Sequence, residues 1–161
     1  MQRKLWIGVA ILLGSSVCVS VVRASEPFDF TSCRSATIDV LAKTDDVYIR
    51  SFDGKGIDSS NHENKLFDNW THRCMGVSAD VGEKRIRHGF CKFMDPDGDL
   101  MLLEWPGAEG KPFTWYFLAG TGKWKGITGS GDYKISKRGK PIEEGTFQFC
   151  VKVTGTYELP K

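Results

Sequence analysis

The segment LAGTGKWKGITGSGDY, from Leu118 to Tyr133, constrains the fold of this chain more than any other feature. Its five glycines alternate with strand-forming and aromatic residues. It is not a phosphate-binding loop, because Gly122 and Lys123 are followed by Trp124 rather than by Ser or Thr at the start of a helix. Glycine permits sharp bends and bulges within a sheet because it accepts positive φ angles. A chain that bends repeatedly while remaining in a sheet suggests a closed β-barrel.

The first 24 residues have the features of a secretory signal peptide. They begin with basic residues, continue with an apolar run to about Leu13 and end with Val22-Arg23-Ala24, which satisfies the small-residue rule for cleavage. A membrane anchor is the alternative, but a spanning helix needs about 20 apolar residues and this run is shorter. We therefore expect a signal peptide over residues 1–24, a single domain over residues 25–161, no membrane span after signal removal, and a periplasmic or secreted protein.

Signal removal also changes the charge of the chain. The 22 Lys and Arg residues fall to 19 because Arg3, Lys4 and Arg23 are lost, whereas all 20 acidic residues remain, which leaves a net charge of −1. No polybasic surface is indicated, so we expect no nucleic-acid partner. The oligomeric state does not follow from the sequence.

Four cysteines remain in the expected mature chain, and an even number in an exported protein favours disulfides. Gly82-Glu83 suits a two-residue type II′ hairpin turn, which places Cys74 directly opposite Cys91 at a separation that a disulfide accepts. Cys33 and Cys150 then remain to pair, and their bond would join the first and last strands of a barrel. The two other pairings stay open on sequence grounds.

The rest of the chain reads as a series of short strands with no convincing helix after the signal. A polar segment from Gly54 to Lys65 lacks any apolar period and predicts a surface loop. We expect an all-β fold, a single antiparallel β-barrel of about eight strands held by disulfides, with a β-sandwich as the alternative. The strand-forming runs are residues 36–42, 46–52, 69–81, 84–94, 100–105, 113–119 and 145–159.

Asp95-Pro96-Asp97-Gly98-Asp99 invites comparison with a calcium loop. An EF-hand would place its glycine two positions later and a glutamate where Pro106 stands, whereas Pro-Asp-Gly is typical of a turn. The hairpin register also places His72 and His88 on opposite faces, so the histidines do not converge on one ion. We expect no metal site and no cofactor.

With these residues in view, the chain resembles the eight-stranded barrels of the allene oxide cyclase and dirigent families. The resemblance rests on residues 117–124, 126–129 and 131–133, which match a Gly-Thr-Gly-aromatic-x-Gly-x-x-Gly segment. The chain also resembles small exported bacterial proteins of unknown function that combine a cysteine-bearing strand, an Asp-Gly-Asp turn and GTGKW. The resemblance implies a barrel whose lumen holds a small apolar molecule, as cyclases hold an epoxide and dirigent proteins orient phenoxy radicals. The families' catalytic residues lie outside the shared segment, so none is carried over.

Glu104 is the candidate catalytic residue, because it is a carboxylate within the apolar run LMLLEW. It shares a strand face with Leu100 and Leu102 and points into the lumen if they do. An apolar lumen would raise the pKa of this carboxyl and suit it to acid or base catalysis. The alternative is that Glu104, near the strand end before Pro106, reaches solvent or pairs with an arginine.

The candidate ligand-binding residues are Tyr48, Arg50, Trp105, Trp115 and Tyr116. Inside the barrel, Arg50 would pair with Glu104 or with a ligand carboxylate; the alternative is that it is a solvated outer charge. The aromatic residues belong either to the barrel wall or to a ligand pocket.

We therefore expect an exported barrel that binds, without catalysis, a small apolar ligand in its lumen or a protein on its surface. One alternative is a cyclase-like or isomerase-like enzyme that uses Glu104 on an apolar substrate. Another is a structural envelope or host-interaction factor.

Overall fold

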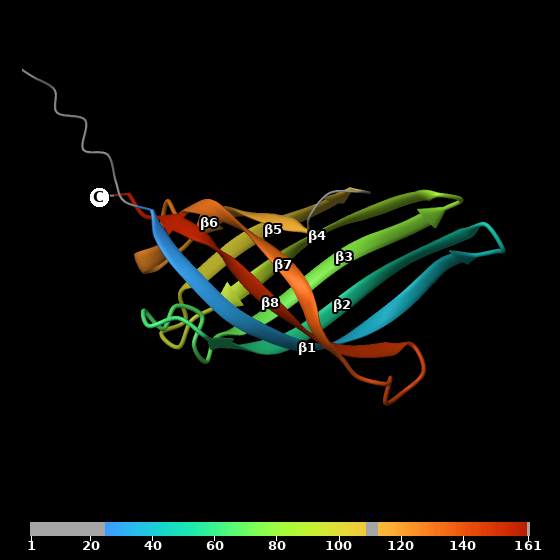
Figure 1. Ribbon diagram of the computed structural model, residues 1–161, viewed down its shortest axis with the longest axis horizontal. Coiled ribbons are helices and arrows are strands. Elements are labelled where there is room, and N and C mark those ends of the chain that lie inside the picture. The colour runs from blue at the N-terminus through green and yellow to red at the C-terminus, as the bar shows by residue number, and fades with distance from the viewer. Residues whose placement is uncertain (1–24, 109–112, 161) are drawn as a thin grey trace, which may run out of the picture.

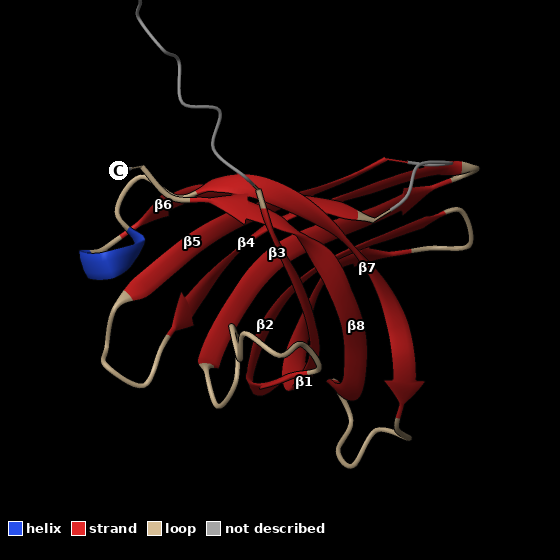
Figure 2. Ribbon diagram, turned by 60° about the vertical axis from the view of Figure 1, so that its left-hand side comes forward, coloured by secondary structure: helices blue, strands red, loops and turns tan. Residues whose placement is uncertain are grey.

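The computed structural model describes residues 25–108 and 113–160, which form a closed antiparallel barrel in which each strand pairs with its neighbours in chain order and β8 returns to β1 (Figures 1 and 2). The expected all-β, eight-stranded barrel is confirmed, and the sandwich alternative is wrong. The signal peptide predicted over residues 1–24 lies outside the described residues. The elements are β1 (Glu26–Lys43), β2 (Val47–Ser60), β3 (Thr71–Val81), β4 (Lys84–Met94), β5 (Leu100–Ala108), β6 (Thr114–Gly120), the 3-10 turn η1 (Gly122–Trp124), β7 (Thr128–Arg138) and β8 (Thr146–Glu158).

Both predicted disulfides are present. The β3–β4 register pairs Cys74 with Cys91 around the turn at Gly82, whose φ is +57°. Cys33 and Cys150 are paired residues of β1 and β8 and are bonded, so a covalent link joins the first and last strands. The Cys74–Cys91 bond lies on the inner face, where both residues are buried, whereas Cys33 and Cys150 are half-buried.

The surface loop predicted from Gly54 to Lys65 is wrong over its first half, because β2 continues to Ser60. A Cβ added at Gly56 would lie 2.0 Å from the Cys33 carbonyl oxygen and 2.7 Å from the His72 ring. The strands approach too closely here for a side chain, so a segment without an apolar period still forms a strand.

One end of the barrel is closed by the segment between β2 and β3. Its apolar residues Leu66, Phe67 and Trp70 are buried, and Phe67 stacks on Phe30 with ring centroids 4.1 Å apart. Figure 1 shows this segment and η1 at the end of the barrel opposite the β1–β2 and β3–β4 turns. The aromatic core therefore fills one half of the lumen.

The glycine-rich segment forms the connection from β6 through η1 to β7 and packs on the Asp95 turn. A Cβ at Gly122, whose φ is +50°, would lie 1.9 Å from an Asp99 carboxylate oxygen. The Lys123 amide donates to the Asp99 carboxylate. The two sequence motifs are thus one structural unit at the closed end.

Candidate functional site

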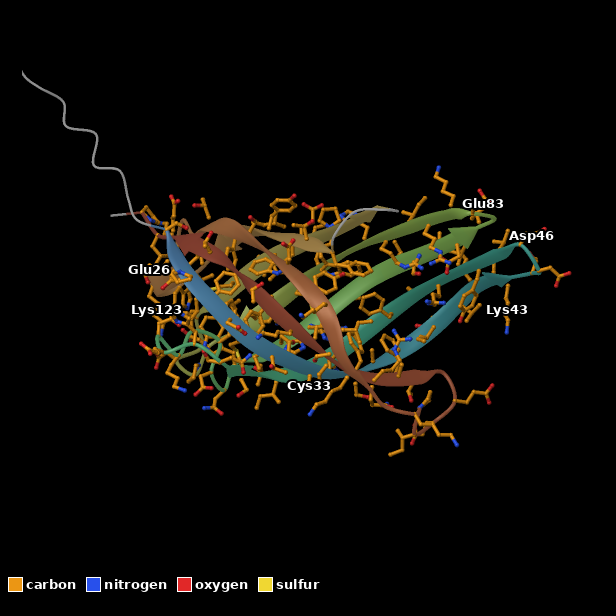
Figure 3. All side chains as sticks on the ribbon, in the orientation of Figure 1. Glu26, Cys33, Lys43, Asp46, Glu83 and Lys123 are labelled. Carbon is orange, nitrogen blue, oxygen red and sulfur yellow. A yellow bond between two sulfur atoms is a disulfide. The ribbon has the colours of Figure 1, made fainter. Side chains whose placement is uncertain are left out.

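A cavity of about 590 Å³ occupies the other half of the lumen. Its lining includes Ile38 and Arg50, which lie in the parts of β1 and β2 nearest their connecting turn. It therefore lies toward the end of the barrel that Lys43, Asp46 and Glu83 mark in Figure 3. A more open depression of about 410 Å³ lies over the Cys33–Cys150 bond on the outer face.

An aromatic wall runs along one side of this cavity. The strand registers place Phe52, Gly76, Gly89 and Trp105 in one row across β2, β3, β4 and β5. The Trp105 indole lies over the two glycines, because a Cβ would meet it at 2.4 Å from Gly76 and at 2.0 Å from Gly89. The Phe52 and Trp105 rings stack with centroids 5.4 Å apart. The two glycines thus make room for a flat aromatic surface.

Phe147 and Phe149 of β8 form a second stacked pair in the lining, with ring centroids 5.1 Å apart. Phe147 also meets Phe52 edge to face at 6.2 Å. The aromatic surface therefore extends from β5 to β8, and a cavity of this size and lining is typical of small-molecule sites.

Four arginines also line the cavity, namely Arg34, Arg50, Arg87 and Arg138, and no acidic residue does among the residues that the structure describes. Arg87 donates to Asp80 over 2.6 Å and to the Ile86 carbonyl oxygen over 2.9 Å. The lumen therefore carries positive charge beside its aromatic wall.

The other three arginines have no carboxylate within salt-bridge distance in the described part of the chain. Arg50 lies over the Tyr48 ring at 4.4 Å from its centroid, and Arg34 lies 5.4 Å from the Phe149 ring centroid. Both contacts are cation–π interactions, which orient a guanidinium but do not neutralise it.

Tyr133, another lining residue, is half-buried. Burial raises the pKa of its hydroxyl to about 12, although Arg34 and Arg87 act in the opposite direction. Tyr133 is thus a neutral donor at physiological pH.

Beneath Arg34 lies a buried polar group that sequence reasoning missed. The His72 ring has Nδ1 3.0 Å from Asp58 Oδ1 and Nε2 3.5 Å from Ser32 Oγ, and all three residues are buried. Arg34 donates to Ser32 Oγ over 3.0 Å. Burial lowers the pKa of the Arg34 guanidinium, and the nearby Asp58 carboxylate opposes that shift.

The series of contacts from Ser32 through His72 to Asp58 is that of a hydrolase triad, but here a substrate has no access to the serine. Ser32 is fully buried and does not line the cavity, and its Oγ already accepts from Arg34. The group instead holds the Arg34 guanidinium, through the hydrogen bond from Arg34 to Ser32 Oγ. The hairpin register placed His72 on the same face as the cysteines but did not say which face is inside, and its partner Asp58 lay in the segment predicted as a loop.

The sequence-predicted site residues divide between the two faces. Arg50, Trp105 and Trp115 line the cavity, and Tyr48 lies against Arg50. Tyr116 is 45% exposed and does not line the cavity.

Glu104 lies on the outer face and not in the lumen. The inner face of β5 carries Met101, Leu103 and Trp105, all buried, whereas Leu102 is 39% exposed. Glu104 Oε1 lies 2.7 Å from His88 Nε2 on the outside of β4. The condition for an inward Glu104, that Leu100 and Leu102 point inward, is not met.

The Asp95 carboxylate is surrounded by hydrogen-bond donors of the protein itself. Asp95 Oδ1 accepts from the amides of Asp97 and Asp99, each over 2.9 Å, and Oδ2 accepts from Trp124 Nε1 over 2.9 Å and lies 2.8 Å from Lys123 Nζ. Burial disfavours the charged form of Asp95, but the bonds from Lys123, Trp124 and Asp99 outweigh it and lower its pKa. The Lys123 ammonium therefore pairs with two carboxylates of the turn, those of Asp95 and Asp97.

No cluster of three or more potential metal ligands occurs within the described residues. Across residues 25–108 and 113–160, no helix has the length and hydropathy that a membrane span requires.

No protein-family model matches the chain, and no curated protein matches it. Among solved structures, the chain is similar to the pterocarpan synthase dirigent protein GePTS1. The two share 10% sequence identity with a TM-score of 0.48, over 91% of this chain and 100% of that chain. The fold assignment rests on the strand pairing described above.

Proposed function

We propose that this protein binds a small, largely apolar ligand in the lumen of its barrel and does not transform it. The observation that carries the proposal is the cavity of about 590 Å³ lined by two stacked aromatic pairs. Proteins close-pack their interiors, so a void of this size at the end of a barrel whose other half is filled favours an occupant.

Binding without catalysis is favoured over a cyclase-like reaction at Glu104, because that carboxylate lies on the outer face, beside His88. The two disulfides are compatible with the proposed export, since such bonds persist in oxidising compartments.

Occupancy is tested by native mass spectrometry of the protein purified from its own exported fraction. We expect a reproducible extra mass that is lost on denaturation. Recovery of the bare mass alone, at every collision energy, would count against a resident ligand.

The site is tested with the neutral fluorophore N-phenyl-1-naphthylamine and two tryptophan substitutions. Ile135→Trp adds bulk at a lining residue that is 45% exposed, so we expect weaker probe binding without damage to the core. Leu118→Trp is the matched control, because Leu118 is 51% exposed and does not line the cavity. Equal effects of the two substitutions would contradict lumenal binding.

A further inference from the structure

A row of hydrogen-bond donors crosses the inner wall of the cavity. The β2–β3 register pairs Arg50 with Ser78, and the β3–β4 register pairs Ser78 with Arg87. All three residues line the cavity. The two arginine side chains only donate hydrogen bonds, whereas the Ser78 hydroxyl can both donate and accept.

Ser78, at the centre of this row, has an unmet hydrogen bond. It is only 4% exposed, and its Oγ has no partner in the described part of the chain. Buried polar side chains almost always have partners, so the Ser78 hydroxyl, in a cavity-lining position between Arg50 and Arg87 in the strand register, indicates a hydrogen bond to be completed by an occupant of the cavity.

The charges of the row are unequal. Arg87 is neutralised by Asp80, whereas Arg50 has only the face of the Tyr48 ring. Arg138, at the end of β7, lines the same cavity and has no carboxylate within salt-bridge distance among the described residues. A carboxylate offers a guanidinium two parallel charge-assisted bonds, which are stronger in a partly dehydrated lumen than in water.

The aromatic row lies directly beside the donor row. Phe52 follows Arg50 by two residues, Gly76 precedes Ser78 by two and Gly89 follows Arg87 by two, so both rows face the lumen. Two residues of a strand span about 6.6 Å. A carboxylate at Arg50 and Ser78 would therefore place an attached ring against the stacked Phe52 and Trp105.

From this juxtaposition we propose that the lumen is a site for an aromatic carboxylic acid, whose acid group is held by Arg50 and Ser78 and whose ring lies on Phe52 and Trp105. This inference rests on the lumenal binding proposed above and specifies its ligand class. It adds a single negative charge to the small apolar ligand expected from the sequence, and it chooses the ligand carboxylate as the partner of Arg50.

The test compares two probes of nearly the same shape, 2-naphthoate and its neutral amide 2-naphthamide, by titration calorimetry with the full mature protein. Hydrogen bonds to a charged group predict that naphthoate binds about tenfold more tightly or better. Equal affinities of the two probes in the wild-type protein would overturn the proposal without any variant.

Substitutions then locate the acid group. Arg50→Gln should abolish the preference for naphthoate, because it weakens naphthoate binding far more than naphthamide binding, and Ser78→Ala should reduce the preference in part. Arg85→Gln is the control, because Arg85 is an exposed arginine of β4 that does not line the cavity. A preference that survives Arg50→Gln in a folded protein, judged by circular dichroism, would refute the assignment. If Arg50→Gln does not fold, Arg50→Lys, which keeps the charge but loses the paired donors, should lower the preference.

The outcomes separate the two proposals. If the neutral fluorophore binds and Ile135→Trp blocks it while naphthoate shows no preference, lumenal binding stands and the acid site fails. If no probe binds, or if Ile135→Trp has no effect, lumenal binding itself fails.

Discussion

The Cys33–Cys150 bond joins the two ends of the barrel, and its removal should cost more stability than that of any local cross-link. It spans 117 residues, whereas Cys74–Cys91 spans 17. In the chain-entropy model, closing loops of these lengths in the unfolded state stabilises the fold by about 4.9 and about 3.1 kcal/mol, respectively.

The native state should survive loss of the outer bond. Cys33 and Cys150 are only half-buried, so Cys33→Ala with Cys150→Ala removes little core packing. The paired residues of β1 and β8 extend from Glu26 with Tyr157 to Thr37 with Thr146, which keeps the barrel closed by hydrogen bonds. We therefore expect a folded variant whose free energy of unfolding falls by about 4 to 5 kcal/mol.

Urea unfolding, followed by circular dichroism and tryptophan fluorescence, measures this loss. The control is the double variant Cys74→Ala with Cys91→Ala, which opens only a hairpin but also removes buried sulfur, since Cys74 is fully buried. The dependence of the free energy on urea should rise more for the outer variant, because its unfolded chain expands more. A loss below about 2 kcal/mol with an unchanged urea dependence would refute the loop-entropy reasoning.

Three further predictions concern stability and processing. Gly89→Ala should destabilise the protein by about 1 to 3 kcal/mol, measured by urea unfolding, because the new Cβ would lie 2.0 Å from the Trp105 ring. Lys123→Met should raise the pH at which the protein unfolds in acid. The pKa of the Asp95 carboxyl is lowered in the folded protein, so its contribution to the free energy of unfolding is fully present above the unfolded pKa of 3.8 and is lost as pH falls through the folded pKa. Loss of the Lys123 ammonium raises that folded pKa, so the contribution is lost at a higher pH. The mature protein should begin at Ser25, and reduction should add the mass of four hydrogens, as two disulfides require; intact mass spectrometry measures both.

Matched controls accompany these predictions. Gly139→Ala should be nearly neutral, because its nearest neighbours would lie at 3.6 and 3.7 Å, an ordinary contact distance. Lys125→Met removes the same charge two residues after Lys123 and should leave the acid transition unchanged. If either control behaved like its partner, the change would reflect a general effect of the substitution and not the named contact. A mature mass that retains any part of residues 1–24 would contradict the predicted cleavage site.

Local sequence patterns were sufficient where the partners are set by a turn. The Gly82-Glu83 dipeptide fixed the pairing of β3 with β4 and hence Cys74 with Cys91, because the residue numbers across a two-residue hairpin have a constant sum. The same logic predicted the turn at Asp95-Pro96-Asp97-Gly98, where the Gly98 amide donates to the Asp95 carbonyl oxygen, since turn chemistry is local. Closure of the barrel then left one partner for Cys33.

Residues near in space but far in sequence were not predictable in this way. The buried group of Ser32, Asp58 and His72 joins three strands, and Asp58 lies in a run with no apolar period. Its strand character comes from the close approach of β1 and β3 to Gly56, which only the assembled barrel supplies.

Sequence patterns predicted an all-β barrel, the register of the β3–β4 hairpin and the two disulfides, but a sandwich and the other cysteine pairings stayed open until the strands were placed. Only the tertiary structure decided which face of each strand points inward. Alternation along a strand fixes which residues share a face but not which face is buried, and β5 is apolar on both faces, with Leu102 outside and Leu103 inside. That choice placed Glu104 on the surface and left the lumen to Arg50 and its neighbours. The physical reason is that burial of a face depends on the strands packed against it, and those strands come from the whole chain.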